Sequence, residues 1–373
     1  MPASNSTTTA GGTVPRSKAL RVGFLSLTDA APFVVAHELG YFSRHGVRVT
    51  LCREIGWATI REKIIYGELD AAPAPAPVLW SAQLGLGCPP CDVLTAQVLS
   101  LNGNAITLSR SLWDAGVRDG ATLREHARTR RSRQPLTFGV VFPFSSHNLL
   151  LRDWLRTAGL DPDRDVRIVV VPPAQMFRNF SAHTIDGFCA GEPWNTLAVR
   201  EGAGWCPAWS SRLQPGQVEK ILMVTRRFAE SRHPDHAALI RALSDAARWC
   251  DEPQNREPLA DLLAGAPYLN LPARVISPAL LGQFGCGNGR TESEPDFIVF
   301  NRGDANVPAV SKAKALQSAL GAAGLLAAAA AHDPELPRRL FREDLHREIC
   351  ANHPLPNEIA TSPDLRGVSS QTG

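Results

Sequence analysis

The stretch LRVGFLSLTDAAPFVVAHELGYFSRHGVRV, residues 20–49, decides the fold class of this chain. It contains an apolar run, a loop whose one charged residue is Asp29, a segment with helical spacing that ends at Gly46, and a second apolar run. A glycine suits the position after a helix C-terminus, and the spacing of the apolar residues is typical of a helix. The stretch therefore predicts a strand–helix–strand unit of an α/β fold.

The same alternation continues along the chain in two sets. Apolar runs at 47–53, 92–101 and 105–110 alternate with a helix-like segment that starts at Trp57. A second set follows a charged, turn-rich stretch, with predicted strands at 136–142 and 166–171. Between these two strands lies a predicted helix with Ser145 or Ser146 at its N-cap. Two such sets predict two lobes with parallel-rich sheets and a ligand cleft between the lobes.

Composition excludes some classes of protein. The 373 residues include 39 basic and 36 acidic side chains, so the net charge of +3 gives no electrostatic case for nucleic acid or an anionic membrane. No apolar run precedes Leu20, and no long charge-free apolar stretch occurs elsewhere. The sequence therefore predicts a cytoplasmic protein, unless the true start lies upstream. Residues 1–18 and 361–373 are predicted to be disordered or flexible.

Eight cysteines are scattered along the chain, and only Cys88 and Cys91 lie close together, in CPPC. A zinc site would need a second close pair or suitably placed histidines. Such a C-x-x-C pair can be redox-active, or it can be a loop with two thiols. The sequence leaves the role of Cys88 and Cys91 open and predicts no metal.

Candidate ligand residues follow from the strand pattern, because open α/β sheets bind ligands beyond the carboxyl ends of their strands. Each candidate also has a purely structural reading: a core tryptophan, a surface histidine, a solvated lysine or a structural turn. Motifs typical of hydrolases, P-loop proteins and zinc proteases are absent from the sequence, so no enzyme is predicted. The candidates are Trp57, Asn104, His147, Lys220, Gly191 and Glu192.

Seven stretches in the same order resemble one family. They are GFLSLTDAAPFVVAHELGYF, GWATIREKI, LNGNAITLS, FPFSSHNLLLRDWL, VVVPPAQMFRNF, DGFCAGEPWNTLAV and RWCDEPQNREPLADLLA, and they cover roughly residues 20–300. The chain resembles the nitrate- and bicarbonate-binding proteins of bacterial ABC importers and their cytoplasmic relatives, the NasS-type nitrate/nitrite sensors. The resemblance implies a two-lobed, periplasmic-binding-protein-like fold of type II. Lobe 1 would comprise 19–106 plus 223–360, and lobe 2 would comprise 107–222.

The resemblance also implies an anion site at Trp57, Asn104, His147 and Lys220, with no cofactor. Nitrate binders of the family carry glutamine at the Asn104 position, and bicarbonate binders carry an acidic residue at the Lys220 position. A lysine stabilises a nitrate or nitrite anion, whereas a carboxylate would repel it unless a metal or a proton intervened. Trp57 suits a wall, Asn104 and backbone N–H groups suit donors in the plane of the anion, and His147 and Lys220 supply donors and charge.

The function implied by the resemblance is a cytoplasmic sensor that controls a NasT-type RNA-binding antiterminator protein, without itself contacting nucleic acid or membrane. One alternative is the extracytoplasmic receptor of a nitrate or bicarbonate ABC importer. Another is an enzyme of pyrimidine-moiety synthesis for thiamine, which shares the fold and uses a buried histidine and lysine. The VVPPAQM and FCAGEPW stretches argue against that enzyme.

Overall fold

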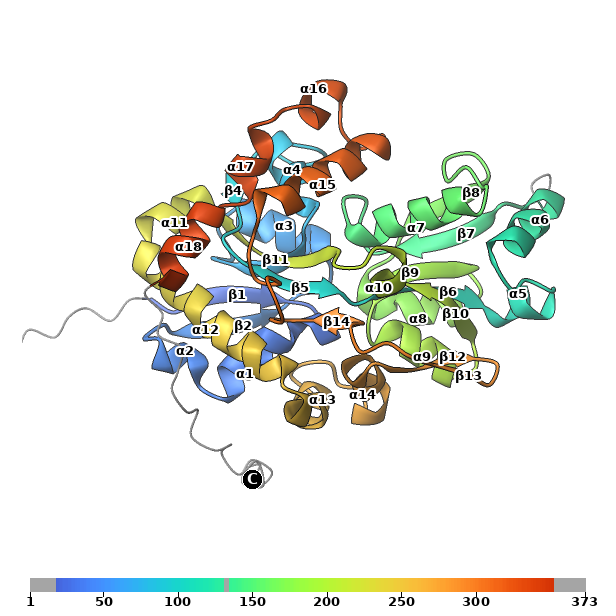
Figure 1. Cartoon of the computed structure of the whole chain (residues 1–373), viewed down its shortest axis with the longest axis horizontal. Helices are drawn as coiled ribbons and strands as arrows, with labels where there is room; N and C mark the ends of the chain where they lie inside the picture. Colours follow the sequence, from blue (N-terminus) through green and yellow to red (C-terminus); the bar gives the residue numbers. More distant parts are fainter. Residues whose placement is uncertain (1–17, 131–133, 352–373) are drawn as a thin grey trace, which may run out of the picture.

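The computed structural model describes residues 18–130 and 134–351. The predicted disordered start lies outside the described residues apart from Lys18, and so does the tail at 361–373. The chain forms two α/β lobes, each built around a five-stranded sheet, which lie side by side in Figure 1. The alternating pattern predicts these two lobes, but its expectation of parallel-rich sheets is wrong for the first sheet, whose strands pair antiparallel.

The sheet of the first lobe combines strands from distant parts of the sequence. Its order is β14 (Ile298–Val299), β5 (Val98–Asn102), β11 (Val218–Thr225) and β3 (Ala72–Pro75), with β4 (Val93–Leu94) also paired to β11. The opening unit adds β1 (Leu20–Phe24) and β2 (Val49–Arg53), which pair in parallel, and a bridge from Val22 to Ala71 brings β1 beside this sheet. β1 therefore runs parallel to the chain that leads into β3, at the side of the first sheet.

The sheet of the second lobe has the order β10 (Gly204–Trp209), β6 (Asn104–Ser109), β9 (Gly187–Gly191), β7 (Leu136–Val140) and β8 (Val166–Val170). β7 runs parallel to both β8 and β9, whereas β6 runs antiparallel to β9 and β10. The register pairs Asn104 with Gly191, so the start of β6 and the end of β9 lie at the same edge. That edge faces the first lobe.

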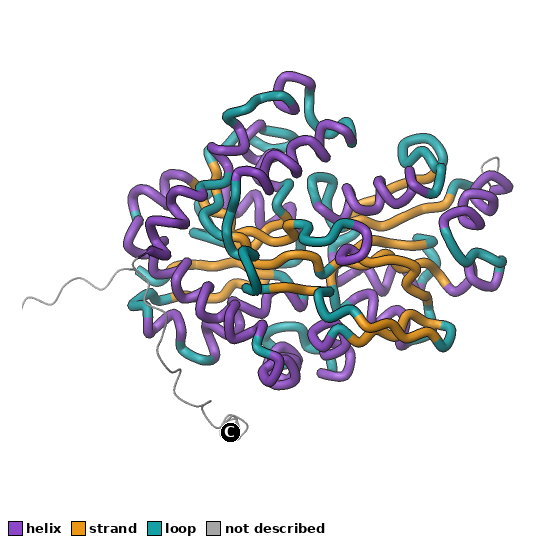
Figure 2. The backbone as a smooth tube through the Cα atoms, in the orientation of Figure 1, coloured by secondary structure: helices purple, strands orange, loops and turns teal. Residues whose placement is uncertain are grey.

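Helices flank both sheets, as Figure 2 shows. Those of the second lobe are α5 (Arg110–Asp114), α6 (Gly120–Arg130), α7 (Ser146–Thr157), α8 (Pro173–Ser181), α9 (Trp194–Arg200) and α10 (Ser210–Leu213). Those before residue 104 are the 3-10 helix η1 (Thr28–Ala30), α1 (Ala31–Glu38), α2 (Tyr41–Arg44), α3 (Trp57–Ile65) and α4 (Val78–Leu84). Those after residue 225 are α11 (Arg226–Ser231), α12 (His233–Asp251), η2 (Pro253–Asn255), α13 (Arg256–Ala264), α14 (Ala273–Leu281), α15 (Val310–Ala322), α16 (Ala328–Ala331), α17 (Leu336–Leu340) and α18 (Glu343–Ala351).

One apolar core spans the junction of the lobes. It joins Leu27 and Trp57 of the first lobe to Met176, Phe188 and Ala190 of the second, all nearly inaccessible to water. Separate cores lie under β1, α1 and α12 and around β6 and β7. The continuous core means that this structure has its lobes closed on each other.

The predicted lobe boundaries can be placed on these elements. The boundary between 106 and 107 falls inside β6, and that between 222 and 223 falls inside β11. The hairpin of β12 (Gln283–Gly287) and β13 (Arg290–Ser293), although late in the sequence, packs on α9 and β10 of the second lobe. The exact division into lobes stays a prediction. Over the described ranges, no helix combines the length and apolarity that a bilayer crossing requires.

Candidate functional site

A bulge in β11 brings two charged side chains together. The pairing of β11 with β5 shifts register on both sides of Lys220, whereas side chains of a regular strand point alternately to opposite faces. Lys220 Nζ therefore lies 2.5 Å from Glu219 Oε1, and neither side chain is more than 1% exposed. The same Nζ lies 2.9 Å from Asp29 Oδ2. The first lobe thus contributes a buried lysine between two carboxylates.

Asp29 lies in η1, which begins at Thr28, a few residues after the end of β1 at Phe24. The backbone N–H of Thr28 donates to the carbonyl oxygen of Glu192 at 2.8 Å, which joins the loop after β1 to the end of β9 in the second lobe. Gly191 precedes Glu192, and a Cβ at Gly191 would lie 3.5 Å from Asp29 Oδ2 and 3.6 Å from Asn104 Oδ1. The absence of a side chain at Gly191 keeps the space beside these two groups open.

The second lobe presents hydrogen-bond donors to the same cluster. Ser145 is the N-cap of α7 and accepts from the backbone N–H of Asn148, so Ser146 and His147 occupy the first turn. The Ser146 hydroxyl donates to Glu219 Oε2. Asn104 Nδ2 donates to the same oxygen at 2.5 Å. His147 Nε2 lies 3.5 Å from Glu219 Oε1.

Trp57, the first residue of α3, forms a wall of the cluster. Lys220 Nζ lies 5.0 Å from the centre of the indole ring, within the range of a cation–π contact. Trp57 is 1% exposed, so the contact is shielded from water. The tryptophan is therefore both a core residue, as its structural reading holds, and a neighbour of the charged cluster.

Burial and charge oppose each other in the ionisation of these groups. Burial acts to lower the pKa of Lys220, but Asp29 and Glu219 together raise it above its usual value, so the lysine is charged. Burial acts to raise the pKa of Glu219, but Lys220, His147 and Ser146 bring it below its usual value. Burial raises the pKa of Asp29 despite the attraction of Lys220.

Burial also shifts the pKa of two further groups toward their neutral forms. Burial lowers the pKa of His147 to about 4, so its imidazole is uncharged near pH 7. Burial raises the pKa of Glu192 to about 7, although Thr196 and Asn195 stabilise its carboxylate. With His147 neutral, the positive charge that faces Glu219 comes from Lys220.

Several buried polar atoms around the cluster lack a hydrogen-bond partner among the described residues. Such atoms are uncommon in folded proteins and each calls for an explanation. A bound polar ligand between the lobes would give them partners. The atoms are Thr28 Oγ1, Trp57 Nε1, Asn104 Oδ1, both ring nitrogens of His147, and Glu192 Oε1.

The structure brings the residues predicted from the sequence to one place. Asn104, His147 and Lys220 approach the Glu219 carboxylate, Trp57 lies against Lys220, and Gly191 lies beside Asp29. The Glu192 side chain instead accepts from the backbone N–H of Thr196 at 3.1 Å. Their role as ligand-binding residues stays a prediction.

Sequence reasoning missed Glu219 and Ser146 and gave Asp29 no role. Asp29 had a signal, because it is the one charged residue in the loop after the first strand. Glu219 had none, because strand alternation would place it on the face opposite to Lys220. In the part of the chain that the structure describes, no group of three or more His, Cys, Asp or Glu residues is arranged to hold a metal ion.

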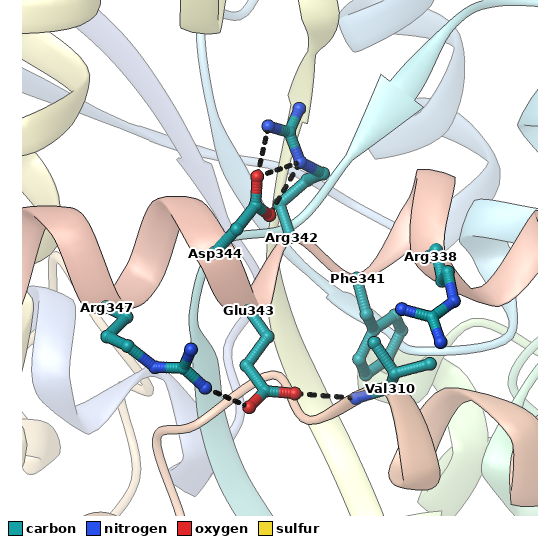
Figure 3. Close-up of a pocket in the computed structure, with 7 residues that line it drawn as sticks. All are labelled: Val310, Arg338, Phe341, Arg342, Glu343, Asp344 and Arg347. Atoms are coloured by element: carbon teal, nitrogen blue, oxygen red, sulfur yellow. Dashed lines mark hydrogen bonds and ion pairs between the residues drawn. The ribbon is translucent and has the colours of Figure 1, made fainter.

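A separate surface pocket of about 430 Å³ lies among α15, α17 and α18 (Figure 3). Two of its three arginines are neutralised inside it, since Arg342 pairs with Asp344 at 2.6 Å and Arg347 with Glu343 at 2.7 Å. None of the predicted ligand residues lines this pocket. The cluster between the lobes is therefore the stronger candidate site.

Comparison with known proteins identifies the relatives of this chain. The NMT1-like family matches residues 14–264. The nitrate import ATP-binding protein NrtC of Synechocystis sp. is 37% identical over 335 residues, which is 89% of this chain and 50% of that protein. The bicarbonate transport ATP-binding protein CmpC of Synechococcus elongatus is 38% identical over 69% of this chain and 39% of that protein. The chain thus spans about half of these curated relatives or less.

A solved structure extends the similarity to the whole fold. The periplasmic nitrate-binding protein NrtA from Synechocystis is 26% identical and superposes with a TM-score of 0.86, over 94% of this chain and 93% of that one. The two-lobed α/β fold predicted from the sequence is therefore confirmed as that of the substrate-binding proteins.

Proposed function

Because this chain belongs to the NMT1-like family, among relatives of nitrate- and bicarbonate-binding substrate-binding proteins, we propose that it binds nitrate or nitrite as a cytoplasmic sensor. One observation carries the proposal. Donors from both lobes, on Lys220, Asn104 and Ser146, converge on a single carboxylate between the lobes. A cluster that holds a carboxylate in this way has the donors that a small planar oxyanion requires.

The chemistry of that carboxylate resembles that of the proposed ligands. A carboxylate and a nitrite ion each carry one negative charge shared by two oxygens on a bent O–X–O group, and nitrate adds a third oxygen in the same plane. Charge-assisted donors such as Lys220 Nζ favour these groups, and the amide of Asn104 adds direction. The indole face of Trp57 suits the apolar face of a flat ion.

Sensing would arise from the two lobes. An anion that is bound more tightly by the closed form shifts the protein toward closure, and a partner that prefers the open form is then released. We propose a NasT-type RNA-binding antiterminator as this partner.

The second candidate function is bicarbonate binding, in which this chain would act as a component of an ABC importer. The observation that favours it is the buried Glu219 carboxylate, because bicarbonate has an O–H group that can donate to a carboxylate, whereas nitrate and nitrite have none. The 38% identity to CmpC adds weight to this alternative. We propose binding rather than catalysis in either case.

Isothermal titration of the purified chain with nitrate, nitrite and bicarbonate tests the proposal. We expect nitrate or nitrite to bind and bicarbonate not to bind. The Lys220→Gln variant should lose binding and also lose about 3–5 kcal/mol of unfolding free energy, because two carboxylates remain buried without their cation.

The matched control is Lys314→Gln, which removes an exposed lysine and should leave binding unchanged and stability within about 0.5 kcal/mol. Bicarbonate as the sole ligand would favour the second candidate. If a folded Lys220→Gln protein bound the anion as tightly as the wild type, Lys220 would not be a ligand-binding residue. Co-purification with a NasT-type protein, reversed by nitrate, would support the sensor role, and an unchanged complex would contradict it.

A further inference from the structure

The Glu219 carboxylate lies where the sequence predicts an external anion. Four side chains are predicted to surround that anion. Of these, Asn104 donates to the Glu219 carboxylate and Lys220 forms an ion pair with the same carboxylate. His147 lies 3.5 Å from it, and Ser146 adds a donor that the sequence did not indicate. The chain therefore supplies its own anion to the candidate site, on a side chain that is 1% exposed.

This internal anion also bridges the lobes. Glu219 belongs to β11 of the first sheet, whereas Asn104 begins β6 and Ser146 begins α7 in the second lobe. An external anion that used the same donors would have to take them from Glu219. It would also add a third negative charge to a buried site in which Lys220 already faces Asp29 and Glu219. Placing unbalanced charge in a buried site is costly.

We propose that binding of a monovalent oxyanion is coupled to the uptake of one proton from solvent by Glu219, which then gives up its donors to the incoming anion. The inference rests on the proposed function of this site as an oxyanion site. One O–H bond forms on the Glu219 carboxyl, and no bond in the ligand breaks. The net charge of the site is then the same before and after binding.

The groups that face Glu219 agree with this assignment. They are Asp29 from η1, Lys220 from β11, His147 from α7 and Cys189 from β9. Burial keeps Cys189 neutral, since its pKa lies well above the usual value. Asp29 pairs with Lys220 at 2.9 Å within the first lobe, so this ion pair does not depend on the donors of the second lobe. Glu219, by contrast, loses its contacts with Ser146, Asn104 and His147, which help to offset its burial, so its affinity for a proton rises.

Titration calorimetry of the wild-type protein with nitrate, in buffers of different ionisation enthalpy, measures this proton uptake directly. We expect about one proton per nitrate and a Kd that rises about tenfold per pH unit above neutrality. In Glu219→Gln the uptake should fall to about zero, and nitrate should bind at least tenfold more tightly at pH 8. The control His147→Gln keeps the charges of the site and should keep an uptake near one.

Infrared difference spectra identify the acid itself. A protonated-carboxyl band should appear when nitrate binds, should shift when the glutamates are labelled with ¹³C, and should be absent in Glu219→Gln. A band that follows labelled aspartate, or proton uptake that is lost in His147→Gln, would overturn the assignment to Glu219. Nitrate binding without proton uptake in the wild type would overturn the inference and leave the proposed function standing. Absence of any oxyanion binding, in the wild type and the variant alike, would overturn both.

Discussion

At the scale of single residues, His147 shows how burial changes the chemistry expected from the sequence. A histidine in the first turn of a helix was predicted to be either a ligand or a surface residue. The structure buries it completely beside Glu219, and burial lowers its pKa to about 4. The imidazole is therefore neutral near pH 7 and can donate through one ring nitrogen and accept through the other.

This lowered pKa predicts an acid-sensitive contribution to stability. The unfolded chain protonates a histidine near pH 6.5, whereas folded His147 stays neutral down to about pH 4. The unfolded state thus holds more protons in this window, and the free energy of unfolding falls as the pH falls from 6.5 to 4, by about 3 kcal/mol from this group. Urea unfolding at stepped pH should show a smaller fall for His147→Gln.

His236 offers a matched control, because burial in α12 also lowers its pKa to about 4 and it lies outside the cluster. The His236→Gln variant should reduce the same pH dependence while leaving anion binding unchanged. His147→Gln should reduce it and weaken binding as well. If the free energy of unfolding of both variants fell with pH as steeply as that of the wild type, the lowered pKa values of His147 and His236 would be contradicted.

At the scale of elements, the spacing of apolar residues predicts helices and strands whose causes are local in the sequence. The sequence predicted α7 with its cap, because a serine before an apolar helical pattern has a local physical cause, and the structure confirms Ser145 as that cap. It could not predict the bulge in β11, which depends on pairing with β5, a strand more than a hundred residues away. In a regular strand, adjacent side chains point to opposite faces, so only one of Glu219 and Lys220 would be expected at the site. The structure places both of them there.

The end of β9 gives a prediction at the same scale. A methyl group at Gly191 would contact Asp29, Asn104 and Leu27 at 3.5–3.7 Å, which is ordinary van der Waals distance. Gly191→Ala should therefore fold with a stability within about 1 kcal/mol of the wild type, because no backbone strain or overpacking arises. The methyl group would nevertheless occupy space beside the anion donors and should weaken anion binding about tenfold, or about 1.4 kcal/mol.

Gly285→Ala is the matched control, because a Cβ there meets nothing within 4 Å. It should leave both the melting temperature and the Kd unchanged. Titration calorimetry and thermal unfolding of the two variants make the comparison. An unchanged Kd in Gly191→Ala would place the anion away from the end of β9.

At the scale of the whole molecule, the two lobes follow from the repeated strand–helix alternation, but their closure does not. The core that joins Leu27 and Trp57 to Phe188 and Ala190 combines residues that carry no shared sequence period. The sequence likewise gave no sign that the hairpin of β12 and β13 packs on the second lobe. Contacts between lobes depend on the tertiary arrangement, which local patterns do not encode.

Closure itself can be tested where the start of α3 meets the start of α8. A Cβ at Gly56 would lie 3.8 Å from Cβ of Pro172, which is the usual separation across a disulfide. The double variant Gly56→Cys, Pro172→Cys should therefore form a disulfide that holds the lobes closed. Pro172 has no backbone N–H, so its replacement removes no hydrogen bond of the backbone.

Because an anion buried between the lobes must enter through an open form, the oxidised double variant should bind nitrate at least a hundredfold more slowly than the reduced one, and dithiothreitol should restore the rate. Stopped-flow fluorescence, with Trp57 beside the site as the reporter, measures this rate. The single variant Gly56→Cys controls for the eight native cysteines, which are free in the structure. Equal rates in the oxidised and reduced double variant, with the disulfide verified by mass spectrometry, would mean that the anion reaches its site without separation of the lobes. The proposed signal would then have to come from a conformational change other than closure of the lobes.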